Sequence, residues 1–352
     1  MTKHINTNQE THRGIQDMSE PQSDAHLSPR ESRVIGALLG VHAGDSLGAT
    51  FEFESHTSIA RRYPYGLRDI VGGGPFSWSP GDATDDTDMT RGVLLAYYDL
   101  QCRNLGDDIA RLAGDYFVRW MRGDWPDRRP GSYPVDIGGA TAKGLNKYKQ
   151  TKDPDRAGAG PGSAGNGSLM RCVPTGLFQT DPAKLVEESQ RISKITHDDE
   201  RCTISCAAYN TIVSKLIDQV SPADAIEAGL HVAEKLEGRS GPVYEAIELG
   251  KSLDVATLAE KGPRPELKGR CSGFVLESLS VAIAAVRDTR NLVDVLVDVV
   301  RIGWDTDTNA AIAGGLLGAR DGMAAIPSDW RSILQFGEEF ESIALSLLRK
   351  ET

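Results

Sequence analysis

The sequence predicts an all-α protein, folded as a compact orthogonal helical bundle. From Ser28 onward, nearly every segment has apolar residues at helical spacing. In one of them the apolar positions are Met89, Val93, Tyr97 and Leu100. Alternating strand patterns with hairpin turns are hard to find. Glycine makes up 37 of the 352 residues and recurs in alanine-rich helical segments, which indicates helices whose backbones approach closely.

Helix starts can be read directly from the sequence. Residues 28–31 (Ser-Pro-Arg-Glu) combine a capping serine, a first-turn proline and the glutamate of a capping box. Residues 181–182 (Asp-Pro) and 221–224 (Ser-Pro-Ala-Asp) predict two more starts. Further helices are expected over 106–122, 184–194, 203–218, 310–319 and 331–349. We expect one large domain over residues 28–352, because no linker divides this stretch convincingly.

The first 27 residues differ from the rest of the chain. They contain no aromatic residue and few aliphatic ones, in a mixture of polar side chains. Such a composition is typical of a disordered tail, or of an arm that becomes ordered on a partner. Residues 1–27 are therefore predicted to be an N-terminal arm that is either inert or partner-binding.

Composition excludes several classes of protein. The net charge is −11, which argues against nucleic-acid or anionic-membrane partners. There is no apolar run of 18 residues and no secretory signal pattern. The five cysteines include no Cys-x-x-Cys pair, as expected of free thiols in a reducing compartment. We therefore expect a cytoplasmic protein with no membrane or nucleic-acid partner.

Two acidic motifs carry most of the chemical information. Residues 84–88 (Thr-Asp-Asp-Thr-Asp) and 305–309 (Asp-Thr-Asp-Thr-Asn) each lie directly ahead of a predicted helix. Capping and the helix dipole account for one acid, but two or three carboxylates in a few residues repel one another unless a cation offsets them. Oxygen donors without histidine or thiolate favour magnesium or manganese. Two such motifs predict a cleft that holds a pair of metal ions.

Three weaker features accompany the acidic motifs. Glu52 is either a solvated helix-end residue or a general base whose pKa is raised by neighbouring phenylalanines. Residues 165–171 (Gly-Asn-Gly-Ser-Leu-Met-Arg) form a glycine loop that runs into a helix, which suits a phosphate or diphosphate if it is not a plain surface loop. His197 is either structural or a ligand contact. No Walker or dinucleotide-binding pattern accompanies the glycines.

Taken in this order, the motifs resemble the ADP-ribosylglycohydrolase family. The matching pieces are Gly-Asp-x-Leu-Gly at 44–48 with Glu52, Thr-Asp-Asp-Thr at 84–87, the glycine loop at 165–171, Thr-His at 196–197, and Asp-Thr-Asp-Thr-Asn at 305–309. They span roughly residues 34 to 320. The resemblance implies an all-α fold with a binuclear magnesium or manganese site, and an enzyme that hydrolyses the bond between ADP-ribose and a modified side chain, most often arginine.

The resemblance also assigns roles to individual residues. The implied metal ligands are Thr84, Asp85, Asp86, Asp305, Asp307 and Thr308. Glu52 and Asp86 would be catalytic, with Glu52 beside the metals. The residues implied to line the ADP-ribose are Gly73, Gly74, Asn166, Gly167, Ser168 and His197. Two positions depart from the family pattern, Asp88 and Trp304, and we expect Trp304 to narrow the cleft or stack on a substrate group.

Three functions remain open on the sequence. The first is removal of ADP-ribose from modified proteins, so that the partner is an ADP-ribosylated protein. The second is an immunity protein whose arm, residues 1–27, blocks the active site of an ADP-ribosylating toxin, as the resemblance allows. The third is a two-metal phosphatase or nucleotidase, which the glycine loop and Glu52 fit less well.

Overall fold

The computed structural model describes residues 27–263, 265–267 and 270–350, and almost all of the predicted N-terminal arm lies outside these residues. The fold is all-α, as predicted, and the described residues contain no sheet, only three isolated bridges. The first eight helices are α1 (Pro29–Gly48), α2 (His56–Arg62), α3 (Asp85–Gln101), α4 (Ile109–Met121), α5 (Gly139–Thr151), α6 (Val173–Phe178), α7 (Pro182–Lys194) and α8 (Glu200–Ile217). The others are α9 (Pro222–Glu237), α10 (Pro242–Ser252), α11 (Val255–Lys261), α12 (Val275–Arg287), α13 (Leu292–Arg301), α14 (Thr306–Asp321), α15 (Ser328–Arg331) and α16 (Gly337–Arg349), with 3₁₀ turns η2 (Pro265–Leu267) and η3 (Met323–Ala325).

The predicted helix starts are confirmed. Ser28 and Glu31 form the capping box: the Glu31 N–H donates to Ser28 Oγ at 3.2 Å and the Ser28 N–H donates to the Glu31 carboxylate at 2.7 Å. Asp181 caps α7 and Ser221 caps α9 in the same way, with side-chain oxygens that accept from first-turn N–H groups. The local chemistry of these caps is therefore enough to fix where the helices begin.

Two predicted boundaries are wrong. The helix expected over 331–349 is divided into α15 and α16, because Gln335 bonds to another segment: its N–H donates to the Gly81 carbonyl, and its side-chain oxygen accepts from the Ala83 N–H. The acidic motifs also lie inside their helices. Helix α3 begins at Asp85 and α14 at Thr306, so the carboxylates occupy first turns.

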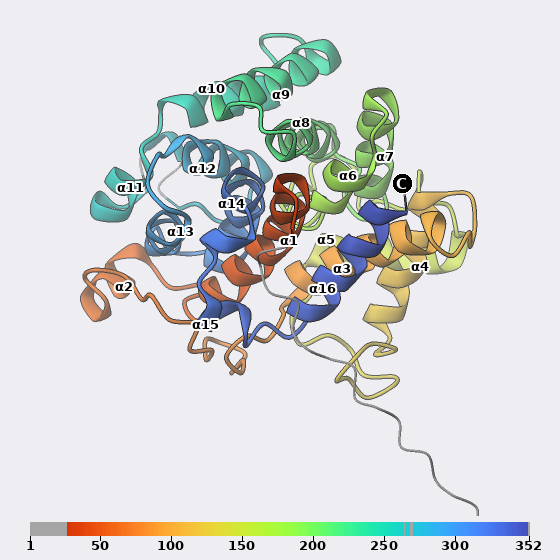
Figure 1. Cartoon of the computed structure of the whole chain (residues 1–352), viewed down its shortest axis with the longest axis horizontal. Helices are drawn as coiled ribbons and strands as arrows, with labels where there is room; N and C mark the ends of the chain where they lie inside the picture. The colour runs from red at the N-terminus through yellow and green to blue at the C-terminus, as the bar shows by residue number, and fades with distance from the viewer. Residues whose placement is uncertain (1–26, 264, 268–269, 351–352) are drawn as a thin grey trace, which may run out of the picture.

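Helices α1 and α14 pack along their whole length at the centre of the molecule (Figure 1). A stripe of glycines at every fourth position of α1 makes this possible. A Cβ atom at Gly40 would lie 2.2 Å from the Gly314 carbonyl oxygen, and one at Gly44 would lie 2.1 Å from that of Ala310. Gly36 and Gly48 continue the stripe. The antiparallel pairing places the C-terminal end of α1 beside the first turn of α14, where the second acidic motif lies.

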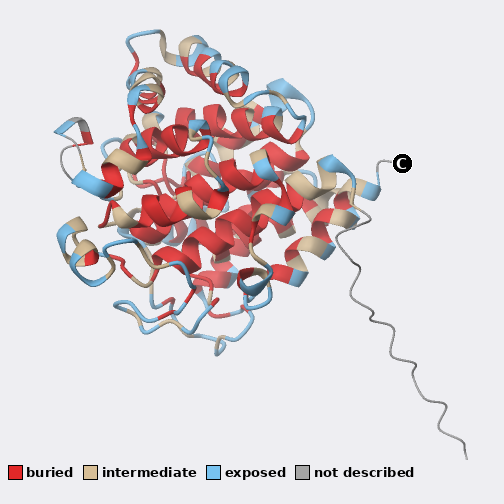
Figure 2. Cartoon of the chain, turned by 60° about the vertical axis from the view of Figure 1, so that its left-hand side comes forward, coloured by how far each residue is buried: buried red, intermediate tan, exposed pale blue. Residues whose placement is uncertain are grey.

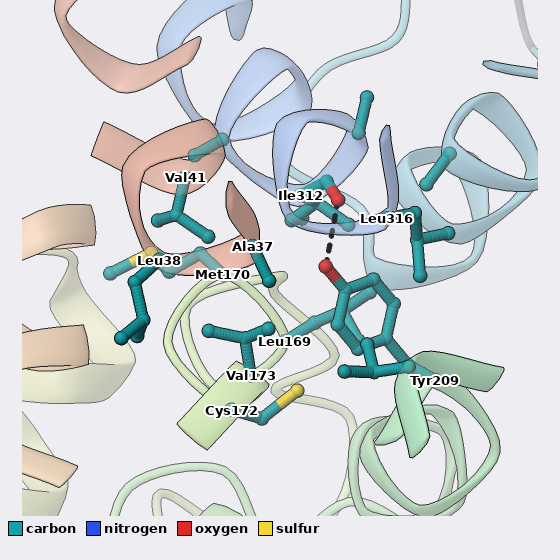
Figure 3. Close-up of a cluster of buried hydrophobic side chains, with 14 of the residues drawn as sticks. Ala37, Leu38, Val41, Leu169, Met170, Cys172, Val173, Tyr209, Ile312 and Leu316 are labelled. Atoms are coloured by element: carbon teal, nitrogen blue, oxygen red, sulfur yellow. Dashed lines mark hydrogen bonds between the residues drawn. The ribbon is translucent and has the colours of Figure 1, made fainter. Parts of the chain in front are cut away.

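The core surrounds this helix pair (Figure 2). Every residue of α1 from Val34 to Gly48 is buried, and so is α14 from Thr306 to Ala319. Helix α8 supports the pair from the side: the Tyr209 hydroxyl donates to the Ile312 carbonyl at 2.8 Å, within the cluster of apolar side chains in Figure 3. The ends of α1 and α14 are therefore held by a rigid, fully packed interior.

Candidate active site

Carboxylates from three helices converge where α1 ends and α3 and α14 begin. Asp45, Asp86 and Asp307 present oxygens that all lie within 4.8 Å of one another, and Glu52, Asp305 and Asp307 form a second such group. Asp45, Asp86, Asp307 and Glu52 are buried, and each has a carboxylate oxygen with no hydrogen-bond partner. Four unpartnered, buried oxygens therefore face a common space.

The remaining oxygens of these carboxylates are held in place. Asp45 Oδ2 accepts from the backbone N–H groups of Thr84 and Thr87, at 3.1 and 3.2 Å, and from the Thr87 hydroxyl. Asp86 Oδ2 accepts from the hydroxyls of Thr84 and Thr308, both at 3.3 Å. The threonines of both motifs thus orient carboxylates, and each carboxylate keeps one oxygen free.

Asp305 is oriented from the glycine loop. Its Oδ2 accepts from Asn166 Nδ2 at 2.6 Å and from the Gly273 N–H at 3.0 Å. Asn166 is itself buried and also donates to the Ser278 hydroxyl. The loop at 165–171 is therefore connected directly to the acidic centre.

Burial and mutual repulsion favour the protonated forms of these acids. Burial raises the pKa of Asp45 to about 7 and, together with the charges of Asp136, Asp305 and Asp45, that of Glu52 to about 8. The pKa values of Asp86 and Asp307 are raised well above their usual range, first by burial and then by neighbouring carboxylates. In the described part of the chain, no lysine, arginine or histidine forms an ion pair with any of them.

Such a centre fits a hard divalent cation. Unpartnered carboxylate oxygens, hydroxyls and no thiolate or imidazole are the donor set of magnesium or manganese. A bound cation would offset the repulsion that raises the pKa values. The described residues thus include a buried acidic cluster that could hold metal.

A cavity of about 680 Å³ opens from the acidic centre. The lining residues named by the sequence motifs are Glu52, Asp85, Asn166, Gly167, His197, Asp305, Asp307 and Thr308. Its far wall is the first turn of α5, with residues 138–141. His197 is 3 % exposed, and burial, followed by the charge of Arg171, lowers its pKa to about 3, so the imidazole is neutral.

Some predicted residues lie elsewhere. Gly73 and Gly74 do not line this cavity; Gly74 packs on the end of α1, where a Cβ atom would lie 2.0 Å from the Ala49 carbonyl oxygen. The Ser168 hydroxyl points into the core and accepts from Ser193 Oγ at 2.8 Å. Thr84 and Asp86 lie behind the carboxylates that line the cavity. Trp304 does not line it either, and its backbone pairs with Phe53 and Glu54 instead.

Asp88 is oriented away from the other acids of its motif. Its two carboxylate oxygens accept from the indole N–H groups of Trp120 and Trp125, each at 2.7 Å. Burial raises its pKa to about 6. Asp88 therefore ties α3 to α4 and the segment that follows, and its departure from the family pattern is explained by these two tryptophans.

Sequence reasoning missed two acids of the centre. Asp45 is the single acid in the glycine-rich, apolar end of the first helix. This end is buried in the structure, and an isolated acid among apolar residues is the sequence pattern that could have indicated its role. Asp136 lies in the segment between α4 and α5 and contributes to the raised pKa values of Glu52 and Asp85. No local pattern marks Asp136, because only the fold brings it to the cavity.

Comparison with known proteins identifies the class of this fold and site. Residues 26–352 match the family described as ADP-ribosylglycohydrolase. The ADP-ribosyl-[dinitrogen reductase] glycohydrolase of Rhodospirillum rubrum is 30% identical over 315 residues, 88% of this chain and 92% of that protein. An ADP-ribosylarginine hydrolase of Pseudomonas putida (strain GB-1) is 28% identical over 324 residues, 91% of this chain and 80% of that protein.

A solved structure supports the same family assignment. A chain of an "ADP-ribosylglycohydrolase-related protein complex" superposes with a TM-score of 0.73 at 27% identity, covering 93% of this chain and 100% of that one. This chain belongs to the ADP-ribosylglycohydrolase family and is an enzyme of that type. The predicted family and all-α fold are confirmed.

Two other predictions concern location and partners. Among the described residues, no helix has the length and apolar character needed to cross a bilayer. The toxin-blocking alternative depends on residues 1–27, nearly all of which lie outside the described residues, and nothing in the fold or in these relatives supports it.

Proposed function

We propose that this chain hydrolyses the N-glycosidic bond between ADP-ribose and an arginine side chain of a modified protein, with two magnesium or manganese ions. The observation that carries the proposal is the cluster of buried carboxylates with four unpartnered oxygens, two of which belong to Glu52 and Asp307 in the wall of a cavity of about 680 Å³. Cations at this site would offset the mutual repulsion of the carboxylates and could activate a water molecule.

The residues that would hold the cations come from both acidic motifs, from α1 and from the turn that follows α1. They are Asp45, Asp86, Asp307, Glu52 and Asp305, with Thr84, Thr308 and Asp85 beside them. When bound, the cations supply Lewis-acid activation of water and fix the hydroxyls of the ribose. None of these donors is a histidine or a thiolate, whereas zinc centres usually contain them, so the donor set favours magnesium or manganese over zinc.

The chain's own residues then complete the reaction. Glu52 lies at the cavity wall with Oε2 unpartnered, so it can take the proton of the attacking water at that atom. The water oxygen bonds to the anomeric carbon, the bond from this carbon to the protonated guanidinium breaks, and the electron pair leaves with it as neutral guanidine, which then takes up the proton that Glu52 removed from the water. The ADP-ribose extends from the acids toward Asn166, Gly167 and His197.

Two observations favour arginine as the leaving group. The relatives from Pseudomonas putida and Serratia proteamaculans are ADP-ribosylarginine hydrolases by name. A second cavity, of about 240 Å³, shares Asp85 and Asp136 with the first and is lined also by Asp88, Trp78, Trp120 and Arg128. Carboxylates and aromatic rings together suit a guanidinium side chain.

The test is release of ADP-ribose from arginine-modified protein in the presence of magnesium. We expect Asp307→Asn to lose activity by roughly 100-fold or more, because a metal ligand matters more than the outer contacts that cost 10–100-fold. Asp321→Asn is the matched control, since Asp321 ends the same helix and pairs with Arg320 at the surface. Full activity of Asp307→Asn would disprove the metal assignment.

The linkage is tested separately. Arginine-linked, serine-linked and small-molecule ADP-ribose are compared at equal concentration with the magnesium- and the manganese-loaded enzyme. We expect the arginine-linked substrate to react fastest. Faster hydrolysis of the serine-linked substrate would contradict the arginine proposal and leave the hydrolase assignment intact.

A further inference from the structure

Exposed apolar side chains border the mouth of the large cavity. Of the eight large apolar side chains that are exposed among the described residues, three line this cavity: Phe53, Tyr133 and Val135, which are 59, 57 and 70 % exposed. Phe76 lines it beside them, and Pro134, between Tyr133 and Val135, is buried and anchors that segment. Single exposed apolar residues are ordinary, whereas several around one cavity indicate a binding surface. We call Phe53, Phe76, Tyr133 and Val135 the rim.

Phe53 is held at the rim by its backbone. Its φ angle is 65°, in the left-handed region that a bulky residue rarely adopts. The Phe53 N–H donates to the Trp304 carbonyl at 2.7 Å, and the Trp304 N–H donates to the Glu54 carbonyl at 2.6 Å. Because the Phe53 ring is exposed, packing of the core does not account for this unfavourable backbone conformation. Such conformations cluster at functional sites, so the position of this ring is consistent with a role in binding.

The rim also borders the smaller cavity of about 240 Å³. The Phe76 ring packs edge-on against Phe53, with centroids 6.3 Å apart, and against Trp78, with centroids 6.0 Å apart. Trp78 lines the smaller cavity, and Val135 and Asp136 line both cavities. One apolar surface therefore adjoins the acidic centre and the pocket that suits a guanidinium group.

The reaction determines which part of the substrate reaches the rim. Under the proposed function, ADP-ribose extends from the acids toward the glycine loop at 165–171, so its anomeric carbon lies at the acidic end. The arginine bonded to that carbon remains part of the modified protein, whose polypeptide must lie outside the cavity next to this end. Glu52, the proposed base, is followed directly by Phe53. The rim is thus the apolar surface beside the place where the polypeptide emerges.

The charges around the two cavities favour a basic partner. Five acids line the large cavity, and no lysine or arginine of the described residues lines it. Five aspartates line the smaller cavity, where Arg128 is the basic side chain found in the described part of the chain. Asp127, one of these aspartates, is exposed and accepts from Gln335 Nε2 at 3.0 Å. A polypeptide that carries lysine or arginine would therefore be attracted to this face, and an acidic one repelled.

We propose that the rim docks the polypeptide of the modified protein, and that this polypeptide is a basic segment with an apolar residue close to the ADP-ribosylated arginine. The proposal rests on the proposed function, because it takes the leaving group to be a protein-bound arginine. Aromatic side chains contribute much of the binding energy of protein interfaces, and the surrounding acids select the charge of the partner. The rim recognises the protein, and the cavity recognises ADP-ribose.

The first test compares two substrates of the magnesium-loaded enzyme, an arginine-modified protein and the free conjugate ADP-ribosyl-arginine. We expect Tyr133→Ser and Val135→Ser each to lower kcat/KM for the protein about tenfold, and to leave kcat/KM for the free conjugate within about twofold. Leu105→Ser is the matched control, because Leu105 is 50 % exposed and lines neither cavity. This control should leave the hydrolysis of both substrates unchanged.

The second test concerns the charge of the partner. Two ADP-ribosylated peptides of equal length carry either lysines or glutamates on both sides of the modified arginine. We expect the KM of the lysine peptide to be lower by about threefold or more, and the difference to shrink at high salt, because pairs of exposed charges are weak and screened. Asp127→Asn should reduce the difference. A lower KM for the glutamate peptide would overturn the proposal.

The outcomes separate the two proposals. If Tyr133→Ser and Val135→Ser lose activity equally on both substrates, or on neither, the rim proposal is wrong and the proposed function stands. Light scattering tests for a second copy of the chain: a wild-type dimer that dissociates in Val135→Ser would also overturn the rim proposal, because another molecule would then cover the rim. If the wild type hydrolyses neither substrate, the proposed function fails, and the rim proposal fails with it.

Discussion

The two ends of the cavity differ in the polar groups that line them. At one end, Asp45, Asp86 and Asp307 present oxygens that have no hydrogen donor, and their pKa values are raised. At the other end, here called the donor end, the first turn of α5, Thr141 and His197 line the cavity, and the pKa of His197 is lowered to about 3. Under the proposed function, cations would occupy the acidic end and the anionic ADP-ribose would extend toward the other end, in a chain whose net charge is −11.

The two ends also depend on different parts of the fold. The acidic end is set by the close packing of α1 on α14, which brings two helix termini together. The donor end is set by the buried contacts of Arg171 and by the start of α5. We therefore expect variants at the acidic end to act on metal binding and kcat, and variants at the donor end to act on KM.

The largest effect is expected from Asp45, the acid that sequence motifs left without a role. Asp45→Asn removes a charge from the centre and should lower kcat roughly 100-fold or more, with a smaller change in ADP-ribose affinity. Steady-state kinetics at saturating magnesium measures both. Asp99→Asn is the control: Asp99 is a buried acid of α3 that pairs with Arg103 and Tyr116 outside the cavity. Retained kcat in Asp45→Asn would show that Asp45 only orients the motif at 84–87.

A second effect is expected from the helix packing. In Gly44→Ala the new Cβ atom would lie 2.1 Å from the Ala310 carbonyl oxygen, so α1 and α14 must move apart. We expect the free energy of unfolding to fall by about 1–3 kcal/mol and the magnesium affinity to fall with it. Chemical denaturation and metal titration measure the two quantities.

The control for Gly44 is an equally close helix contact away from the site. A Cβ atom at Gly250 would lie 2.6 Å from the Ser280 carbonyl oxygen, between α10 and α12. Gly250→Ala should therefore destabilise the fold without weakening metal binding. Unchanged magnesium affinity in Gly44→Ala would show that the acids hold their arrangement independently of the glycine stripe.

The sequence predicts those features of the site that depend on neighbouring residues in the chain, and it misses those that depend on how distant segments pack. Caps such as Ser28 with Glu31 are local patterns and were predicted, and so was the gathering of acids at helix N-termini, although Asp307 lies within the first turn of its helix and not ahead of it. Asp45 joins the centre only because α1 pairs with α14, and Asp136 only because the segment before α5 folds over the cavity. Gly73 and Gly74 do not line the cavity, and Gly74 packs on Ala49 instead; a glycine loop that packs in this way has the same composition as one that binds a ligand.

A smaller effect is expected at the donor end. In Gly167→Ala a Cβ atom would lie 2.9 Å from His197 Cε1 and 3.3 Å from Thr141 Oγ1, which displaces both donors. KM should rise about tenfold with little change in kcat, as for the loss of one charge-assisted hydrogen bond. At Gly165 the nearest atom would be 3.4 Å away, so Gly165→Ala should have a smaller effect. A kcat loss as large as that of Asp45→Asn would show that the two ends are not separable.

The smallest effect expected is a dependence of stability on pH that has opposite signs at the two ends. In metal-free protein, acids whose folded pKa is raised, Asp45 to about 7 and Glu52 to about 8, contribute stability that is present at low pH and lost as pH rises through those values. His197, with its folded pKa lowered to about 3, contributes stability that is present above pH 6.5 and lost as pH falls below it. Two acids act against one imidazole, so metal-free protein should lose stability as pH rises from 5.5 to 8, by roughly 1–3 kcal/mol in total relative to pH 9. Magnesium should remove the loss of stability at high pH, because cations then take the place of the protons.

Thermal unfolding with EDTA or with magnesium, from pH 5.5 to 9, measures stability against pH in the two conditions. Coincident curves would mean that the carboxylates are compensated by something other than a metal ion.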